Sequence, residues 1–498
     1  MPGDMILVVD YGGTQVQSTA RKLRGDRVYC EILPPDAATG KLTDPDVKGV
    51  LLAGTPADDV EVDEALFTAD VPVLALGACA RRLCVSMGGK ALAAQIEART
   101  AQITFADSPL FDGLIESDRY FERVDMLELP EGAEAIAFSP GGVVPAFADE
   151  EKKIFGLQFY AESNDPDGLR ILSNFACGVC GCETWWSMEA FAADFENQMK
   201  EAFTEGTALL AISGGVDSSV CAAIMHRAIG ERLKCVFVDT GLMRLGEREI
   251  VKKVFLDDLG LDFLIVDAAD RFLARLEGVV DPNEKRNAIA DEMMHVIADE
   301  ARGFGKIDCL VQATIYPDIL TARCSDNGSP KDQTALMDHI AFDTMIEPLR
   351  MLFKDEVREL GEVLGLPKEI ISRQPFPEAG LAVRCIGEVT RERLAILGRA
   401  DAIFREEIAD AGLDRRIWQY FAVLTSCQSF GMRDGKPCYE YAVALRAVSS
   451  QDAISAYAYR LPYDLLERVV SRITTEVRGV NRVLYDATGK PPAMIEWE

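Results

Sequence analysis

The stretch that decides the fold is TALLAISGGVDSSV, residues 207–220, in which an apolar run of strand length turns into a helical pattern. The junction is Ser213-Gly214-Gly215-Val216-Asp217-Ser218-Ser219. Two glycines let the backbone approach an anion closely, and a helix that begins at such a turn points N–H groups at it. The segment lacks the Gly-Lys-Ser/Thr of the common P-loop. It predicts a phosphate-binding loop, and the alternative is a plain strand-to-helix turn.

Apolar runs alternate with helix-sized segments on both sides of this loop, which is typical of doubly wound parallel sheets. The strands expected after the loop are LKCVFVDT and LDFLIVDA, and those expected before it are ILVVD, GVLLAG, VPVLAL and IFGLQF. Past Pro375 and Pro377, the segments YEYAVALRAV and RVLYDA predict strands that flank helices. The predicted fold class is therefore α/β, with two doubly wound parallel-sheet domains at 1–187 and 188–372 and a small α+β domain at 373–498.

The composition excludes several classes of protein. Of 498 residues, 48% are hydrophobic and 27% charged, the balance of an ordinary globular protein. A count of 52 Lys and Arg against 81 Asp and Glu gives a net charge of −29, which disfavours nucleic acid and anionic membranes as partners. No apolar run of about 18 uncharged residues predicts a transmembrane helix, and the start MPGDMILVVD does not resemble a secretory signal. Thirteen scattered cysteines are typical of reduced thiols, so we expect a cytoplasmic protein.

The loop resembles that of enzymes that split ATP into AMP and pyrophosphate. Nearly end to end, the sequence is similar to the glutamine-hydrolysing GMP synthetase family, in segments that include SGGVDSSV, CVFVDTGLMRLGE, DPNEKR, QATIYPD, FKDEVRELG, PFPEAGLAVR, ALRAVSS and KPPAMIEWE. In that family XMP is adenylylated at the purine C2 oxygen, and ammonia then displaces AMP to give GMP. The resemblance implies a class I glutamine amidotransferase domain, an ATP pyrophosphatase domain, and a third domain that binds XMP and forms a homodimer. ATP and Mg²⁺ are the implied cofactors.

The resemblance also implies roles for individual residues. The implied catalytic residues are Asp217, Ser218 and Lys354, and Asp217 is also the implied ligand of Mg²⁺. The residues implied to bind ATP are Ser213, Gly214, Gly215, Val216, Asp217, Ser218, Ser219, Val238, Asp239, Gln312 and Asp318. Those implied to bind the purine nucleotide are Arg384, Lys490, Ile495 and Glu496. On residue type alone, the alternative for Asp239 is a cap on the following turn, and for the lysines and arginines an ordinary surface charge.

The amidotransferase domain departs from the family pattern at its catalytic positions. Gly77 stands where the family has its nucleophilic Cys, and Tyr160-Ala161-Glu162 stands where it has His-Pro-Glu. Glycine cannot form an acyl-enzyme, and a tyrosine, with a pKa of about 10, is a poor base at neutral pH. None of the three histidines lies in the first 200 residues. We therefore predict that this domain does not hydrolyse glutamine and that Cys79 does not take over as nucleophile.

The acceptor side departs from the family as well. The segment 334–340 is TALMDHI where the family has a lid with Lys-Ser-His-His-Asn, and 373–380 is RQPFPEAG where it has Arg-His-Pro-Phe-Pro-Gly-Pro-Gly. The loss of periodicity between 316 and 347 predicts a mobile loop over the site. We expect the substrate to be XMP or a related purine nucleotide, aminated by free ammonia or by ammonia from a separate amidotransferase.

Two other functions stay open. One is thiolation of the adenylylated nucleotide, for which the candidate cysteines are Cys324, Cys385, Cys427 and Cys438. The other is a pseudo-enzyme that binds nucleotide without catalysis. A third alternative concerns the linker, where Cys177, Cys180 and Cys182 supply three of the four ligands that structural zinc needs.

Overall fold

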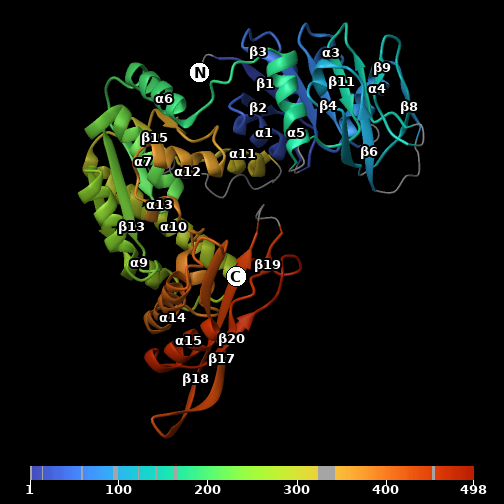
Figure 1. The fold of residues 1–498 in the computed structure, drawn as a ribbon. Coiled ribbons are helices and arrows are strands. Elements are labelled where there is room, and N and C mark those ends of the chain that lie inside the picture. The colour runs from blue at the N-terminus through green and yellow to red at the C-terminus, as the bar shows by residue number, and fades with distance from the viewer. Residues whose placement is uncertain are drawn as a thin grey trace. The chain divides into compact units, whose positions relative to one another are not determined.

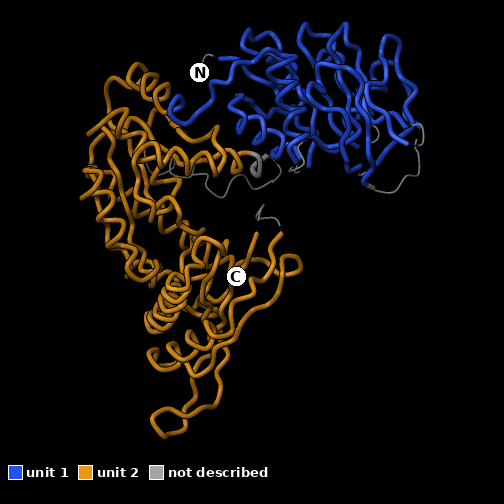
Figure 2. Tube along the Cα trace, viewed as in Figure 1, with its two compact units in different colours: residues 1–191 blue, residues 192–498 orange. Residues whose placement is uncertain are grey.

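The computed structural model describes residues 3–13, 15–57, 60–92, 99–121, 123–140, 143–161, 165–323, 342–450 and 455–498. The chain divides into two compact units, Met1–Phe191 and Ala192–Glu498 (Figure 2). The boundary predicted at 187 lies close to the junction of these units, whereas the boundary predicted at 372 falls inside the second unit. The division into three domains stays a prediction.

The first unit is built on a mixed sheet whose nine described strands follow the order β2-β1-β3-β4-β11-β10-β9-β6-β7 (Figure 1). The parallel strands are β1 (Met5–Asp10), β2 (Tyr29–Leu33), β3 (Val47–Ala53), β4 (Val73–Leu76) and β11 (Ile154–Leu157). The antiparallel strands are β6 (Arg99–Phe105), β7 (Glu116–Phe121), β9 (Glu134–Phe138) and β10 (Ala146–Asp149). The sequence predicted β1, β3, β4 and β11, because strands covered on both faces are continuous apolar runs.

Helices and a short ladder complete this unit. The helices are α1 (Gln15–Gly25), α2 (Pro35–Lys41), α3 (Ala65–Thr68), α4 (Ala78–Ser86) and α5 (Pro166–Ser173), and the ladder pairs β5 (Lys90–Leu92) with β8 (Met126–Glu128). Helix α4 follows β4 after Gly77, and its side chains Cys79 and Leu83 lie in the same buried cluster as side chains of β3 and β4. This strand-to-helix turn is the place at which the family pattern has its nucleophile.

The second unit contains a parallel sheet in the order β14-β13-β12-β15-β16. Its strands are β12 (Ala208–Ile212), β13 (Leu233–Asp239), β14 (Phe263–Asp267), β15 (Cys309–Val311) and β16 (Thr344–Ile346). The helices of this part are α6 (Met188–Ala202), α7 (Val216–Ile229), α8 (Glu247–Lys252), α9 (Ala269–Arg275), α10 (Pro282–Ala301), α11 (Tyr316–Arg323), α12 (Lys354–Val363) and α13 (Lys368–Ile371). The strand order reverses between β12 and β15, and in such sheets ligands bind at the carboxyl ends of the strands next to the reversal.

The rest of the second unit is a sheet with helices on it. A long antiparallel hairpin joins β17 (Gln419–Arg433) to β18 (Lys436–Ser449), which also pairs with β19 (Tyr457–Ala458) and, in parallel, with β20 (Val480–Asp486). The helical elements are η7 (Gly380–Arg384), α14 (Arg391–Asp410) and α15 (Tyr463–Glu476). One cluster of buried side chains contains residues of both sheets of this unit, from Val236 of β13 to Leu445 of β18. The α/β class is thus confirmed, with a first sheet that is mixed and not wholly parallel.

Within the described ranges, no helix has both the length and the apolar character that crossing a bilayer requires.

Candidate active site

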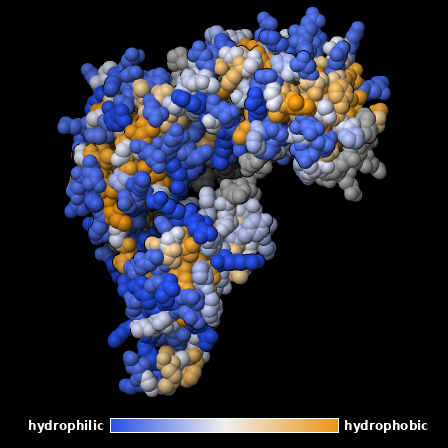
Figure 3. Space-filling model, in the orientation of Figure 1, coloured by the Kyte–Doolittle hydropathy of each residue, from blue (hydrophilic) through white to orange (hydrophobic). Residues whose placement is uncertain are grey.

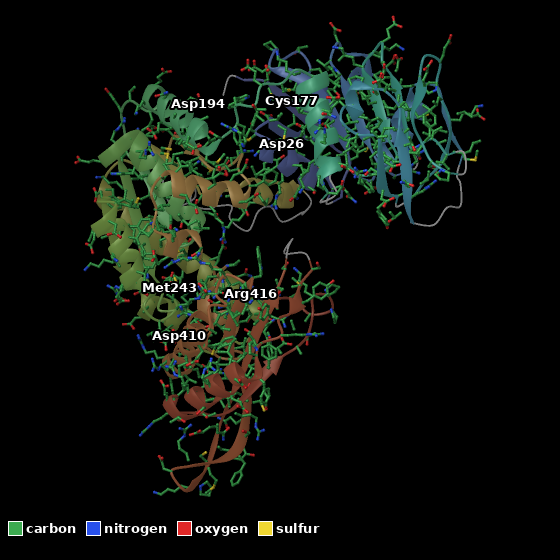
Figure 4. The ribbon with its side chains drawn as sticks, in the orientation of Figure 1. Asp26, Cys177, Asp194, Met243, Asp410 and Arg416 are labelled. Atoms are coloured by element: carbon green, nitrogen blue, oxygen red, sulfur yellow. The ribbon has the colours of Figure 1, made fainter. Side chains whose placement is uncertain are left out.

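The residues predicted to bind ATP come from loops at one edge of the parallel sheet in the second unit. The loop 213–219 follows β12, Val238 and Asp239 end β13, and Gln312 follows β15. Because β13, β12 and β15 are parallel neighbours, their carboxyl ends meet at the same edge. Figure 4 draws the side chains on the ribbon and labels Met243, which lies in the turn after β13.

The backbone of the 213–219 loop has the form of an anion site. Gly214 has a φ of +78°, and a Cβ on it would lie 3.0 Å from Cγ2 of Val251, so the position requires glycine. Gly215 is the N-cap of α7 and contributes no side chain, while Ser213 Oγ lies 3.1 Å from Ser218 Oγ. The first amides of a helix have no carbonyl partner within the helix. They and the two hydroxyls can therefore donate to phosphate oxygens.

Asp217 and Lys354 meet beside this loop. Lys354, the first residue of α12, donates from Nζ to Oδ1 of Asp217 at 2.6 Å. Asp217 lies in the first turn of α7, where the helix dipole stabilises a negative charge. Mg²⁺ is usually held by one or two carboxylates together with phosphate oxygens and water, so a single carboxylate next to a phosphate loop fits it. The structure thus brings the predicted catalytic pair together.

Two other predicted ATP ligands make local contacts. Asp239 accepts a hydrogen bond from the Gly241 amide at 3.0 Å and pairs with Arg248 at 3.1 Å. Asp318 accepts one from the Ile315 amide at 3.0 Å. The contact of Asp239 with Gly241 is the turn cap that its residue type alone allowed. Gln312 and Val238 are buried at the strand ends, and a role for these four residues in ATP binding stays a prediction.

Arg373 contacts the 213–219 loop, a contact that the sequence did not indicate. Its guanidinium donates to the carbonyl oxygen of Gly214 and to Glu247 Oε1, the latter at 2.5 Å. The family pattern associated this arginine with the acceptor nucleotide, because it opens the segment 373–380. No local signal reveals the contact, since Gly214 and Arg373 are 159 positions apart.

The predicted acceptor ligands Arg384 and Glu496 hold each other. Arg384 is 0% exposed, and its Nε and Nη2 donate to the two carboxylate oxygens of Glu496 at 3.0 and 2.7 Å. Its Nη1 is buried without a hydrogen-bond partner among the described residues, and Gln419 donates to the same carboxylate at 2.9 Å. Phe421 lies against the guanidinium, 3.9 Å from its carbon to the ring centroid. Whether the two residues bind nucleotide stays a prediction.

Arg446 is a residue that sequence reasoning missed, although it lies in the segment ALRAVSS. Its buried guanidinium donates to the carbonyl oxygens of Ile495 at 2.7 Å and Met494 at 2.9 Å, and it pairs with Asp486. Burial alone would raise the pKa of Asp486, but its hydrogen bonds with Thr488 and the charge of Arg446 hold that pKa below its usual value. Arg446 therefore fixes the backbone next to Ile495 and Glu496.

In the first unit, the ring of Tyr160 lies against Gly77, the position at which the family pattern has its nucleophilic cysteine. Gly77 joins β4 to α4 with a φ of +55° and a ψ of −119°, a conformation that L side chains rarely adopt. A Cβ on Gly77 would lie 2.3 Å from Cε1 and 2.7 Å from Cζ of Tyr160. The turn is thus built around glycine and a tyrosine ring. Glu162, the third degenerate position, lies outside the described residues.

The side chains around the turn at Gly77 are shielded from solvent. Cys79 is fully buried on α4, and its thiol donates to the carbonyl oxygen of Gly54 at 3.6 Å. The hydroxyl of Tyr11 is buried without a hydrogen-bond partner among the residues that the structure describes. Burial raises the pKa of Tyr11, and Cys79 and Asp63 add to the rise. Cys79 is therefore shielded from solvent.

The cysteines of the thiolation and zinc alternatives differ in burial: Cys182 and Cys385 are buried, Cys427 is exposed, and Cys177, Cys180 and Cys438 are half-buried. Burial raises the pKa of Cys182 to about 12 and raises that of Cys180. It likewise raises the pKa of Cys385, whereas Cys427 is exposed. In the part of the chain that the structure describes, no group of three or more His, Cys, Asp or Glu side chains has the arrangement of a metal site. Cys324 and the altered lid segment 334–340 lie outside that part.

Comparison with known proteins gives two family matches. Residues 7–179 match the model of the class I glutamine amidotransferases, and residues 406–497 match that of the GMP synthase C-terminal domain. Proteins named GMP synthase (glutamine-hydrolysing) from Caldicellulosiruptor saccharolyticus and Acetivibrio thermocellus are each 43% identical over 511 residues and cover 100% of both chains. A solved structure of a putative GMP synthase subunit from Thermoplasma acidophilum is 25% identical over 36% of this chain and 96% of its own, with a TM-score of 0.33.

Proposed function

Because the chain belongs to the family of glutamine-hydrolysing GMP synthases, which are ligases that use ATP, we propose that it aminates XMP with ammonia that it does not itself make. In this reaction ATP adenylylates the C2 carbonyl oxygen of XMP, or of a closely related purine nucleotide, with release of pyrophosphate. Ammonia then attacks C2, and AMP leaves with the C2 oxygen. The observation that carries the proposal is the Tyr160 ring beside Gly77, in the place of a nucleophile.

The loop after β12 supports the first step. Its helix amides, with the hydroxyls of Ser213 and Ser218, form a cradle for the departing pyrophosphate. Lys354 lies at the mouth of the same loop and supplies a cation for the charge that develops on that group. Asp217 would hold Mg²⁺, which supplies neutralisation of the phosphate charges when bound.

The pair of Arg384 and Glu496 supports a nucleotide acceptor. Arg384 retains a buried N–H donor that has no partner within the described residues, which suits an anionic phosphate, and Glu496 is a carboxylate, which suits the N–H groups of a purine ring. Lys490 and Ile495 belong to the same segment as Glu496, and Arg446 fixes its backbone. XMP has both a phosphate and ring N–H donors, so it can engage both members of the pair.

The absence of glutaminase activity rests on three features of the first unit. Residue 77 has no side chain to form an acyl-enzyme, Tyr160 fills the vacant space, and Cys79 is buried on the adjacent helix. A tyrosine hydroxyl is also a poor base at neutral pH. Ammonia therefore comes from solution or from a separate amidotransferase.

With Mg-ATP and XMP, we expect the purified chain to form GMP and pyrophosphate when ammonium chloride is present, and neither GMP nor glutamate when glutamine replaces it. Product nucleotides are resolved by mass spectrometry, and glutamate is measured by a coupled assay. GMP formed from glutamine alone would contradict the missing glutaminase. Pyrophosphate release without GMP would point to another acceptor or nucleophile, sulfur included. Failure of every purine nucleotide tried to elicit pyrophosphate would favour a pseudo-enzyme.

We further propose that residues 373–498 form a homodimer. At the hairpin of β17 and β18, Phe430, Met432 and Tyr439 are 64, 63 and 68% exposed, and Figure 3 shows apolar side chains gathered at its tip. An exposed apolar patch of this kind marks a protein interface. Light scattering at micromolar concentration should give twice the chain mass of 54.6 kDa, and Phe430→Asp should shift it toward one chain mass. A monomeric wild-type chain would refute the proposal.

A further inference from the structure

The segment 489–498 carries Lys490, Ile495 and Glu496, three of the four predicted acceptor ligands, yet it lies after the last described strand, β20. Its backbone forms one isolated bridge, between Lys490 and Ala456. A segment without regular structure keeps a defined position only where side chains hold it. The contacts of its last residues therefore act together with those of Arg446 to position Glu496.

Lys285 contacts the last residue of this segment through a buried ammonium group. It is a residue of α10, and it is 0% exposed. Its Nζ donates to the carbonyl oxygens of Ala382 at 3.3 Å and Cys385 at 2.8 Å, and to Oε2 of Glu498 at 2.5 Å. An ammonium group has three N–H donors, and all three have an acceptor here. The next residue of the helix, Arg286, donates to the carbonyl oxygen of Glu498, so two cations of α10 reach the end of the segment.

The three groups that accept hydrogen bonds from Lys285 belong to the two chain segments that carry Arg384 and Glu496. Ala382 and Cys385 bracket Arg384 in the chain, and Glu498 follows Glu496 by two positions. One buried ammonium thus ties the backbone that carries Arg384 to the segment that carries Glu496.

Helix α10 connects this link to the ATP-binding sheet. Its side chains Ile289, Val296 and Ile297 lie in the same buried cluster as Val236 and Val238 of β13. Strand β13 ends one residue after Val238, at the sheet edge that borders the phosphate loop. Packing against the sheet proposed to bind ATP therefore sets the position of α10. The buried ammonium of Lys285 on this helix in turn helps to set the position of the segment 489–498.

We propose that Lys285 is a positioning residue for the acceptor nucleotide, which it serves by anchoring Glu498 and so holding Glu496 opposite Arg384. The proposal rests on the proposed function in one respect, that residues 489–498 contact the acceptor. Without the ammonium, the nearly buried carboxylate of Glu498 loses its charged partner and keeps a hydrogen bond from the Gly387 amide at 3.4 Å, which does not compensate its charge. The segment then loses the buried one of its two links to α10 and keeps the exposed contact of Arg286, while the 213–219 loop keeps its own contacts.

The first test needs no nucleotide and compares Lys285→Met with the wild-type chain by hydrogen exchange. We expect peptides that cover residues 489–498 to exchange at least about tenfold faster in the variant, and those of the 213–229 region to be unchanged. The matched control is Lys306→Met, which removes an exposed lysine paired with Asp308 and Asp343 in the same unit. Unchanged exchange at 489–498 would overturn the proposal, whatever the acceptor is.

The second test is kinetic. In Lys285→Met the KM for XMP should rise at least about tenfold, with the KM for ATP changed by less than about twofold. Glu498→Gln keeps an acceptor for Lys285 and should raise the KM for XMP only about threefold, so it tests the same link if the methionine variant does not fold. Equal changes in both KM values would indicate a merely structural role. A wild-type chain that ignores XMP, with faster exchange in Lys285→Met, would refute the proposed acceptor and leave the anchoring intact.

Discussion

The Asp217→Asn variant should release pyrophosphate from ATP at least about a hundredfold more slowly than the wild-type chain. The substitution keeps the size of the side chain and removes its charge. It thereby removes the carboxylate proposed to hold Mg²⁺ and the partner that Lys354 contacts at 2.6 Å. The measurement is a coupled pyrophosphate assay with saturating XMP and ammonium chloride.

The matched control for this variant is Asp262→Asn. Asp262 is an exposed carboxylate that pairs with Lys234 away from the loop, so its loss tests the effect of charge alone. We expect the control to keep nearly the full rate. If Asp217→Asn kept more than half of the wild-type rate, Asp217 would have no part in the chemistry, and the loop would be a binding element only.

The Gly77→Cys variant should gain no glutaminase activity and should destabilise the first unit by about 3 kcal/mol. The new side chain has to adopt a φ of +55°, and its Cβ would meet the Tyr160 ring at 2.3 Å. Urea unfolding followed through Trp185 and Trp186, which lie in the first unit, reports the stability, and a glutamate assay reports the activity.

A second variant separates the two causes of the lost stability, which are the clash with the Tyr160 ring and the backbone strain at residue 77. In Gly77→Cys/Tyr160→Ala the clash is relieved and the backbone strain remains, so about half of the destabilisation should be recovered. The control is Gly40→Cys in α2, where a Cβ meets nothing within 4 Å, and it should change stability by less than about 0.5 kcal/mol. Destabilisation by Gly77→Cys no greater than in this control would show that Tyr160 does not fill the space.

The parallel parts of the fold could be predicted from sequence, whereas most antiparallel parts could not. Strand β12 is an unbroken apolar run and β13 is one from Cys235 to Val238, as is typical of strands covered by helices on both faces. Strand β7, with the sequence ESDRYF, places charged residues on an exposed face and has no such run. The outer half of β17 is similarly exposed, and only its partner β18 was predicted.

For the site, the sequence itself predicted a phosphate loop at 213–219, and the resemblance supplied the other candidate residues. The loop is local, since its glycines, serines and helix start fall within a few positions. The contacts that organise the site join residues far apart in the chain, 137 positions for Lys354 and Asp217 and 213 for Lys285 and Glu498. No periodicity encodes such pairs, because they arise from the packing of whole elements. Arg446 was missed for the same reason.

Under the proposed function, the glycine at position 77 makes the loss of glutaminase chemistry difficult to reverse by mutation. A cysteine restored there meets the Tyr160 ring, and a smaller residue restored at 160 leaves a cavity beside a turn that still lacks a nucleophile. Either substitution alone, a cysteine at 77 or a smaller residue at 160, should lower stability without giving glutaminase activity, so neither is favoured by selection. Under the proposed function, these two positions together make the dependence on an outside supply of ammonia hard to reverse.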